Sequence, residues 1–304
     1  MTYVIPPATA IGVVQLRVSQ LDRSIRFYEE AVGLRLVRRE GGAAELAAAQ
    51  DGSDRVLLRL RELHTDAAGN AASATPPGRR PGAGLYHFAI LVPDRRSLGL
   101  ALRNLIRHGV SIGQADHLVS EALYISDPDQ NGIEIYADRP RETWRRDANG
   151  EYVMAVDPID WDGLLADAGD LPGNGLPVGT TIGHIHLHVS DLAATERFYN
   201  GVLGFEIVAH MQRSALFISA GGYHHHIGLN VWAGVGAPLT PAYAPGLDYY
   251  TIVVPNAGAD ADTLSTLQSR LEAAGFKPTR DAATSGAPLI VHDPSGIELW
   301  FIAA

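Results

Sequence analysis

The sequence predicts an α+β protein made of four copies of one strand–helix–strand unit, arranged in two curved sheets. Three observations predict this fold. The stretches IGVVQLRVSQLDRSIRFYEEAVGLRLV from Ile11 and IGHIHLHVSDLAATERFYNGVLGFEIV from Ile182 align without a gap. Two looser copies begin at Leu85 and Leu247. Each looser copy ends in an Asp-Pro turn, after which a strand carries a glutamate.

The first and third units share one order of elements. Each begins with an alternating, strand-like run and continues into a helix with a Phe-Tyr pair, Phe27-Tyr28 or Phe198-Tyr199. We expect the helix to end before Gly33 or Gly204, where a second apolar strand begins.

The second and fourth units follow the same plan. Each has a strand and then a helix with leucines at helical spacing, which ends at Gly109 or Gly275. The closing segments, SDPDQNGIEIYA and HDPSGIELWFI, predict a turn and a final strand. All four units therefore consist of a strand, a helix and further strands.

One unit cannot cover its own sheet, so units should pair around shared cavities, and four units make two cavities. The repeat divides the chain into halves at 1–137 and 181–304. The polar segment 138–180 is the expected connector, with a short helix at IDWDGLLADAG. The Ala/Pro/Gly-rich stretch HTDAAGNAASATPPGRRPGAG is an expected surface loop of the first half.

Composition limits the function. A net charge of −10 without a basic cluster argues against nucleic acid as a partner, which favours a small molecule. The absence of cysteine excludes thiolate ligands and leaves histidine and carboxylate as chelators. The chain has no run of eighteen apolar residues and does not begin like a signal peptide, so we expect a cytoplasmic protein that does not bind membranes.

Repeated units with a histidine near the start of the first strand and a glutamate in the last resemble the vicinal oxygen chelate superfamily. That superfamily includes glyoxalases, antibiotic-resistance proteins and extradiol ring-cleaving dioxygenases. The resemblance covers nearly the whole chain and is strongest to the catechol 2,3-dioxygenases. It implies four βαβββ modules that form two curved half-barrel sheets.

The repeat register identifies the candidate metal ligands. The first strands of the second and third units place His87 and His184 at the same position, where the other two units have Val13 and Tyr249. Closing strands carry a glutamate only in the second and fourth units, Glu134 and Glu298.

Only pairing of unit two with unit three unites two histidines and a carboxylate, namely His87, Glu134 and His184. We therefore predict that modules pair 2-3 and 1-4, across the connector, as the resemblance to hydroquinone-cleaving dioxygenases also implies. A single strand histidine is more often structural than a ligand, but three residues at equivalent positions favour a metal site. Two imidazoles and a carboxylate suit Fe²⁺, with Mn²⁺ as the alternative, and leave positions open for substrate and dioxygen.

The same resemblance implies further site residues. His225, four residues before Leu229, matches a catalytic histidine that exchanges protons with dioxygen or the substrate. Strand alternation would place His224 and His226 on the opposite face. Tyr124 matches a tyrosine that hydrogen-bonds the substrate oxygens, and His117 a substrate-contacting loop histidine at a slightly different spacing.

The stretch GHIHLHVSDL places three histidines on one face of a strand. The register makes His184 the ligand, and His186 the expected second residue, which orients the substrate or a ligand by hydrogen bonding. His188 should lie farther along the sheet. The aromatic residues Trp232, Tyr249 and Phe217 are expected in the core rather than at a cavity.

The function predicted is an Fe²⁺-dependent extradiol dioxygenase that cleaves catechol or a substituted catechol with O₂. One alternative is a glyoxalase-like lyase or isomerase, but it would use a fourth ligand where IGLNVW offers Gly228 and Asn230. A second is a metal-free binding or resistance protein. A third places the working site at Tyr249 and Glu298. Edge strands could pair subunits into a homo-oligomer, although the sequence does not fix the oligomeric state.

Overall fold

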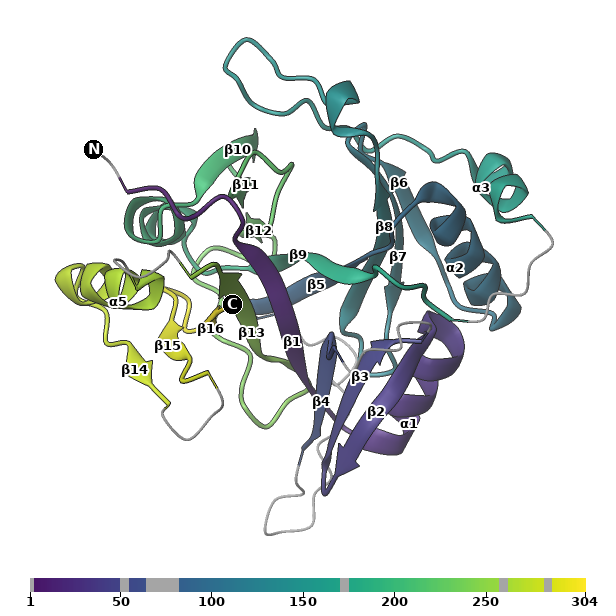
Figure 1. The fold of residues 1–304 in the computed structure, drawn as a ribbon, viewed down its shortest axis with the longest axis horizontal. Helices are drawn as coiled ribbons and strands as arrows, with labels where there is room; N and C mark the ends of the chain where they lie inside the picture. Colours follow the sequence, from purple (N-terminus) through teal and green to yellow (C-terminus); the bar gives the residue numbers. More distant parts are fainter. Residues whose placement is uncertain (1–2, 50–54, 64–81, 170–174, 257–261, 282–285) are drawn as a thin grey trace.

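A computed structural model gives the structure of the protein (Figure 1). It describes residues 3–49, 55–63, 82–169, 175–256, 262–281 and 286–304. Most of the expected surface loop in the first half, residues 64–81, lies outside the described residues.

Four modules follow one another along the chain, as the repeat predicts. Module 1 contains β1 (Ala10–Val18), α1 (Leu21–Phe27), η1 (Tyr28–Val32), β2 (Leu34–Glu40), β3 (Ala43–Ala48) and β4 (Leu58–Glu62). Module 2 contains β5 (Gly84–Leu91), α2 (Arg95–Arg107), β6 (Gly113–Asp116), β7 (Ser120–Ser126) and β8 (Gly132–Asp138).

The second half repeats this order after the connector. Module 3 contains β9 (Thr181–His188), α4 (Leu192–Glu196), η3 (Arg197–Val202), β10 (Glu206–Met211), β11 (Ala215–Ser219) and β12 (Ile227–Asn230). Module 4 contains β13 (Gly246–Val254), α5 (Thr263–Ala273), β14 (Thr279–Arg280), β15 (Leu289–His292) and β16 (Glu298–Ala303). Both η1 and η3 are π-helical turns that hold the Phe-Tyr motif or its end.

The modules pair across the two halves of the chain, which confirms the crossed arrangement. One eight-stranded sheet has the order β14-β15-β16-β13-β1-β4-β3-β2 and the other β10-β11-β12-β9-β5-β8-β7-β6. The modules meet at antiparallel pairs, β1 with β13 and β5 with β9 (Figure 1). We call these the 1–4 sheet and the 2–3 sheet.

The repeated motifs tie the two sheets together. Tyr28 of the first Phe-Tyr pair donates to Asp127 of the Asp-Pro turn in module 2 at 3.0 Å. Tyr199 donates to Asp293 in the equivalent turn of module 4 at 3.3 Å. All four side chains are buried, and each carboxyl also accepts backbone N–H groups of its own turn. The residues of these repeated motifs therefore form buried polar contacts between the two sheets.

The connector does more than join the halves. Its predicted helix is present as α3 (Trp161–Ala168), after a short 3₁₀ turn, η2 (Arg141–Thr143). Before α3, Tyr152 bonds Val208 in β10, and Asp157 pairs with Asp116 in β6. Because β10 and β6 are the two edges of the 2–3 sheet, this segment bridges the open side of its curve.

Across the part of the chain that the structure describes, no helix is long and apolar enough to cross a membrane.

Candidate metal centre and its cavity

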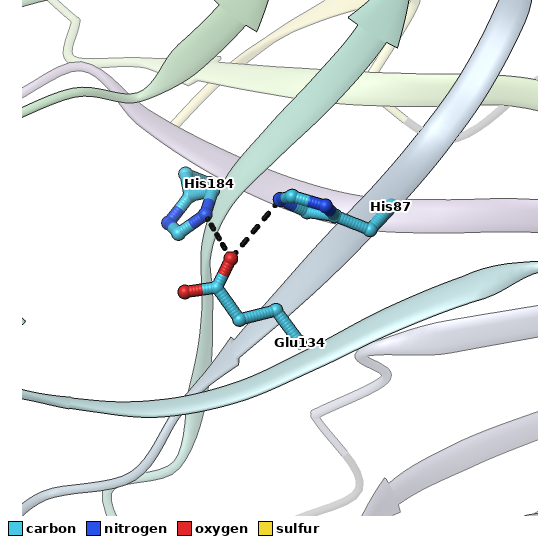
Figure 2. A group of neighbouring side chains, drawn as sticks. All are labelled: His87, Glu134 and His184. Atoms are coloured by element: carbon cyan, nitrogen blue, oxygen red, sulfur yellow. Dashed lines mark hydrogen bonds and ion pairs between the residues drawn. The ribbon is translucent and has the colours of Figure 1, made fainter. Parts of the chain in front are cut away.

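Three side chains from adjacent strands converge on the concave 2–3 sheet. In the strand register, Ala89 of β5 lies between His184 of β9 on one side and Glu134 of β8 on the other. His87 lies two residues before Ala89 and so points to the same face. The Nε2 atoms of His87 and His184 each lie 3.0 Å from Oε2 of Glu134 (Figure 2). The structure thus brings together the three residues that the sequence selects as ligands.

The three groups are all buried, with 6% or less of each residue exposed. Two of them, Glu134 and His87, have pKa shifts that favour metal ligation. Burial alone would raise the pKa of Glu134, but the neighbouring His184 and His87 hold it well below its usual range. Burial also lowers the pKa of His87, although the neighbouring Glu134 acts to raise it. An ionised carboxylate and a neutral imidazole are the forms that bind a cation.

One contact in this cluster is better explained by a cation than by a hydrogen bond. Nε2 of His87 is buried and close to Glu134, yet it has no hydrogen-bond partner in the described structure. Such a buried unpaired nitrogen costs free energy unless something else binds it. The candidate ligand atoms of His87, Glu134 and His184 all lie within 4.8 Å of one another. The residues therefore fit a metal ion.

Two members of the cluster, His87 and Glu134, line a cavity of about 600 Å³. The polar side chains of His225, Tyr124 and His117 line the same cavity. Its apolar lining includes side chains of Met154, Met211, Phe217 and Trp232. A mainly apolar cavity with a few convergent polar groups is typical of a small-molecule site.

His225, a residue that the sequence selects as catalytic, lies beside the cluster. Its ring centroid is 4.1 Å from that of His184, and the ring lines the cavity. Burial, and then the neighbouring histidines, hold its pKa well below the usual range, so the imidazole is neutral.

The expected strand alternation around His225 is wrong. The three histidines precede β12, which begins at Ile227, so the two-residue period of a strand does not apply to them. His224 is fully buried and bonds directly to His225, whereas His226 accepts a hydrogen bond from the backbone of Ala220.

Tyr124 and His117 form a pair on the cavity wall. Nδ1 of His117 lies 2.7 Å from the carbonyl oxygen of Ala155, so that nitrogen carries the proton and Nε2 is the acceptor. The Tyr124 hydroxyl then donates to Nε2 at 2.6 Å. Burial, with Glu134 nearby, raises the pKa of Tyr124 well above its usual value. Its neutral hydroxyl oxygen can still accept a hydrogen bond from a bound molecule.

His186 and His188 differ in their surroundings. His186 lines the cavity, and its buried Nε2 has no partner among the described residues. Its ring has room because residue 228 is glycine: a Cβ there would lie 2.8 Å from the His186 ring. His188 lies outside this cavity and bonds Asn230 at 2.7 Å.

Sequence reasoning missed several parts of the cavity. Met154 and Val156 of the connector form part of its wall. Phe217 and Trp232, expected in the core, also line it, and Trp232 is 43% exposed. An aromatic residue in a strand looks the same in the sequence whether it faces a core or a cavity. The bridging role of the connector depends on contacts with distant edge strands, which no local pattern reveals.

The 1–4 sheet has no comparable cluster in the described chain. Tyr249 stacks on Trp300 with the ring centroids 4.0 Å apart, and Arg59 donates to its hydroxyl. Glu298 accepts from the Trp300 indole and lies near His292. These contacts argue against the alternative that places a metal site at Tyr249 and Glu298.

Crossed βαβββ modules around a buried His/Glu/His cluster define a protein of the vicinal oxygen chelate class. The sequence pattern of the Glyoxalase/Bleomycin resistance protein/Dioxygenase superfamily matches residues 10–135 and 181–301, and the chain belongs to that superfamily. A catechol-2,3-dioxygenase from Bacillus subtilis (strain 168) is 52% identical over 269 residues, which cover 88% of this chain and 89% of that protein. This likeness supports a dioxygenase class.

Solved structures share the fold. A candidate dioxygenase from Bacillus subtilis superposes with a TM-score of 0.63 at 14% identity, over 99% of this chain and 86% of that one. Glyoxalase I from Zea mays gives a TM-score of 0.55 at 16% identity, over 97% and 92% of the two chains. At these identities the likeness extends to the fold alone.

Proposed function

We propose that the protein is an Fe²⁺-dependent extradiol dioxygenase that opens the ring of catechol or a substituted catechol with O₂. The observation that carries the proposal is the convergence of His87, Glu134 and His184 beside the cavity, which His87 and Glu134 line. The 52% identity to a protein named catechol-2,3-dioxygenase supports the same reaction.

His87, Glu134 and His184 would hold the ion. A ferrous ion held by two imidazoles and one carboxylate supplies open positions for both a vicinal diol and dioxygen. Mn²⁺ has similar ligand preferences and is the alternative metal.

The remaining residues would bind the substrate and move protons. Neutral His225 can take a proton from a bound catechol and return it later, because its ring lines the cavity beside the cluster. Tyr124, held by His117, can hydrogen-bond a substrate oxygen. His186 offers a nitrogen with no other partner, which suits a contact to the substrate.

The cavity favours a catechol with apolar substituents. A cavity of roughly 150 Å³ is enough to hold benzene, whereas this one has about 600 Å³. The space beyond one ring is bordered by Met154, Met211, Phe217 and Trp232. We therefore expect alkyl- or aryl-substituted catechols to have higher kcat/KM than catechol itself.

The glyoxalase-like alternative needs a fourth ligand, and the structure gives none at the expected place. Asn230 is engaged with His188 and with the backbone of Trp232. The other candidate position, Gly228, has no side chain, and the ring of His186 lies against it.

The test is an aerobic assay of protein loaded with Fe²⁺ under anaerobic conditions. Extradiol cleavage gives a yellow semialdehyde and consumes one O₂ per ring opened, because both oxygen atoms enter the product. Absorbance and an oxygen electrode measure the two quantities together. No turnover of catechol or its alkyl and aryl derivatives, with the iron fully bound, would refute the proposal. A cytoplasmic location and a homo-oligomeric state stay predictions.

A further inference from the structure

A chain of hydrogen bonds leads from the cavity to the end of β8. Nδ1 of His225 lies 2.8 Å from Nδ1 of His224. Nε2 of His224 in turn lies 2.8 Å from Oδ1 of Asp138. Asp138 is the last residue of β8, four positions beyond Glu134 and on the same face of that strand. The strand β8 therefore carries both the candidate ligand Glu134 and Asp138, the last member of this hydrogen-bonded chain.

The acceptor at the end of the chain fixes the direction of each bond. An ionised carboxylate only accepts, so Nε2 of His224 carries the proton that bonds Asp138. In the arrangement that we infer, the His224 ring has this one N–H, which leaves its Nδ1 as an acceptor. His225 must then donate from its own Nδ1. Its Nε2 is left unprotonated, with its lone pair available to a molecule in the cavity that the ring lines.

The surroundings of His224 hold it in this orientation. The residue is fully buried, and its ring lies against that of Tyr223 at a centroid distance of 4.1 Å. The Trp144 ring approaches at 5.1 Å. Tyr223 also donates to Oδ1 of Asp138 at 3.1 Å, and Tyr136 contacts the Tyr223 hydroxyl at 2.7 Å. The carboxylate and the middle imidazole are thus both fixed by neighbours that the cavity does not touch.

We propose that Asp138 and His224 are positioning residues that hold His225 as the Nδ1–H tautomer, with Nε2 ready to accept a proton from the substrate. The catalytic part of this inference rests on the proposed function. The tautomer itself does not, because it concerns only hydrogen bonds within the protein. Asp138 and His224 are neither members of the ligand cluster nor among the residues that line the cavity, and their hydrogen bonds lead to His225.

Two variants break the chain at different points. His224→Phe keeps a flat ring among Tyr223 and Trp144 but removes both nitrogens. Asp138→Ala removes the carboxylate from a side chain that is 26% exposed, where the structural cost is smaller. Asp138→Glu restores a carboxylate. His226→Phe is the matched control, because His226 is the adjacent histidine and its ring bonds only the Ala220 backbone in the described hydrogen-bond set.

The first readout needs neither metal nor substrate. Nitrogen-15 NMR of metal-free protein labelled at histidine distinguishes a protonated ring nitrogen from an unprotonated one, and the spectrum of His225→Gln assigns the His225 signals. We expect Nδ1–H in the wild type and in His226→Phe. In His224→Phe and Asp138→Ala we expect that preference to be lost. An unchanged tautomer in both variants would overturn the proposal.

The second readout is kinetic. We expect kcat to fall about 10- to 100-fold in His224→Phe and Asp138→Ala, the range seen when a residue that orients a catalytic or ligating histidine is removed. KM for the catechol and the iron content should stay at their wild-type values, and Asp138→Glu should recover part of kcat. A parallel loss of iron would mean a structural role and would overturn the proposal. If the wild type has the Nδ1–H tautomer but never cleaves a catechol, the proposed function fails and the positioning role stands.

Discussion

The two sheets share one topology but use their concave faces differently. At the centre of the 2–3 sheet, Ala89 leaves space between His184 and Glu134. The equivalent strand position in module 4 is Thr251, whose hydroxyl fills that space and accepts from the backbone of Val13 at 2.6 Å. A small residue at the centre thus gives room for ligands, and a larger one closes the same place.

The charged groups differ in the same way. In the 2–3 sheet a buried glutamate faces two imidazoles, each of which has one buried nitrogen without a hydrogen-bond partner. In the 1–4 sheet Asp248 accepts hydrogen bonds from Gln15, Arg17 and Arg61, so its charge is matched. The comparison teaches that the two concave faces differ in how their polar groups are satisfied: imidazole nitrogens without partners lie in the 2–3 sheet, whereas the Asp248 carboxylate of the 1–4 sheet has its partners.

The sharpest test of this difference uses the two repeat-equivalent glutamates. We expect Glu134→Gln to lose at least about 100-fold in Fe²⁺ affinity, more than is lost when a residue that only supports a ligand is changed. Its ring-cleaving activity should be lost as well. Glu298→Gln should keep both. Calorimetric titration of metal-free protein with Fe²⁺ under anaerobic conditions measures the affinities. Loss of iron from Glu298→Gln alone would reverse the assignment of the two sheets.

The next test separates metal binding from proton transfer. We expect His225→Ala to lower kcat about 10²- to 10⁴-fold, the usual contribution of a general acid–base group. Iron content should not change, because His225 lies outside the ligand set. His292→Ala is the control in the 1–4 sheet, since that histidine is 60% exposed and near Glu298. Steady-state oxygen uptake with parallel iron analysis gives both numbers, and iron loss in His225→Ala would contradict this role.

Much of the fold and of the ligand cluster could be predicted because both follow from the sequence repeat. Equivalent positions in four modules reveal which two contain His87 and His184, and the pairing follows from chemistry. His224 could not be predicted in the same way, because it lies before β12 in a segment without strand periodicity. Its partner Asp138 is 86 residues away in the chain. The contact exists only because crossed pairing brings β8 close to module 3.

Substitutions in the 1–4 sheet should change the stability of the protein rather than its ring-cleaving activity. Asp248→Ala leaves two arginines without their carboxylate, and the Arg17 side chain is only 7% exposed. We expect a loss of about 3 kcal/mol in the free energy of unfolding, the lower end for breaking a buried ion pair, because Asp248 itself is 20% exposed. Urea unfolding of metal-free protein measures this loss.

A matched variant in the same sheet sharpens this third test. Glu45→Ala removes the partner of the more exposed Arg59 and should cost less than about 1 kcal/mol. Iron affinity should be unaffected in both variants. Equal costs for Asp248→Ala and Glu45→Ala would show that the Asp248 cluster contributes no special stability.

A fourth test concerns a contact between the sheets rather than either concave face. Burial raises the pKa of Asp293 to about 6 from its ordinary value of 3.8, despite hydrogen bonds that favour the anion. The folded state therefore holds this proton more tightly than the unfolded state does. Stability contributed by Asp293 should be greatest below about pH 4 and fall as pH rises toward 6, by roughly 3 kcal/mol at most at 1.36 kcal/mol per pKa unit.

Asp293→Asn tests this pH dependence, because the amide keeps the size of the side chain but does not titrate. We expect its free energy of unfolding to vary less between about pH 4 and 6 than that of the wild type, by the amount that the Asp293 proton contributes. Urea denaturation of metal-free protein at several pH values across that window measures the difference. Identical pH slopes for the two proteins would mean that Asp293 titrates near its ordinary pKa. In that case Tyr199 would donate its hydrogen bond to an Asp293 carboxylate that is already ionised in the acidic part of this range.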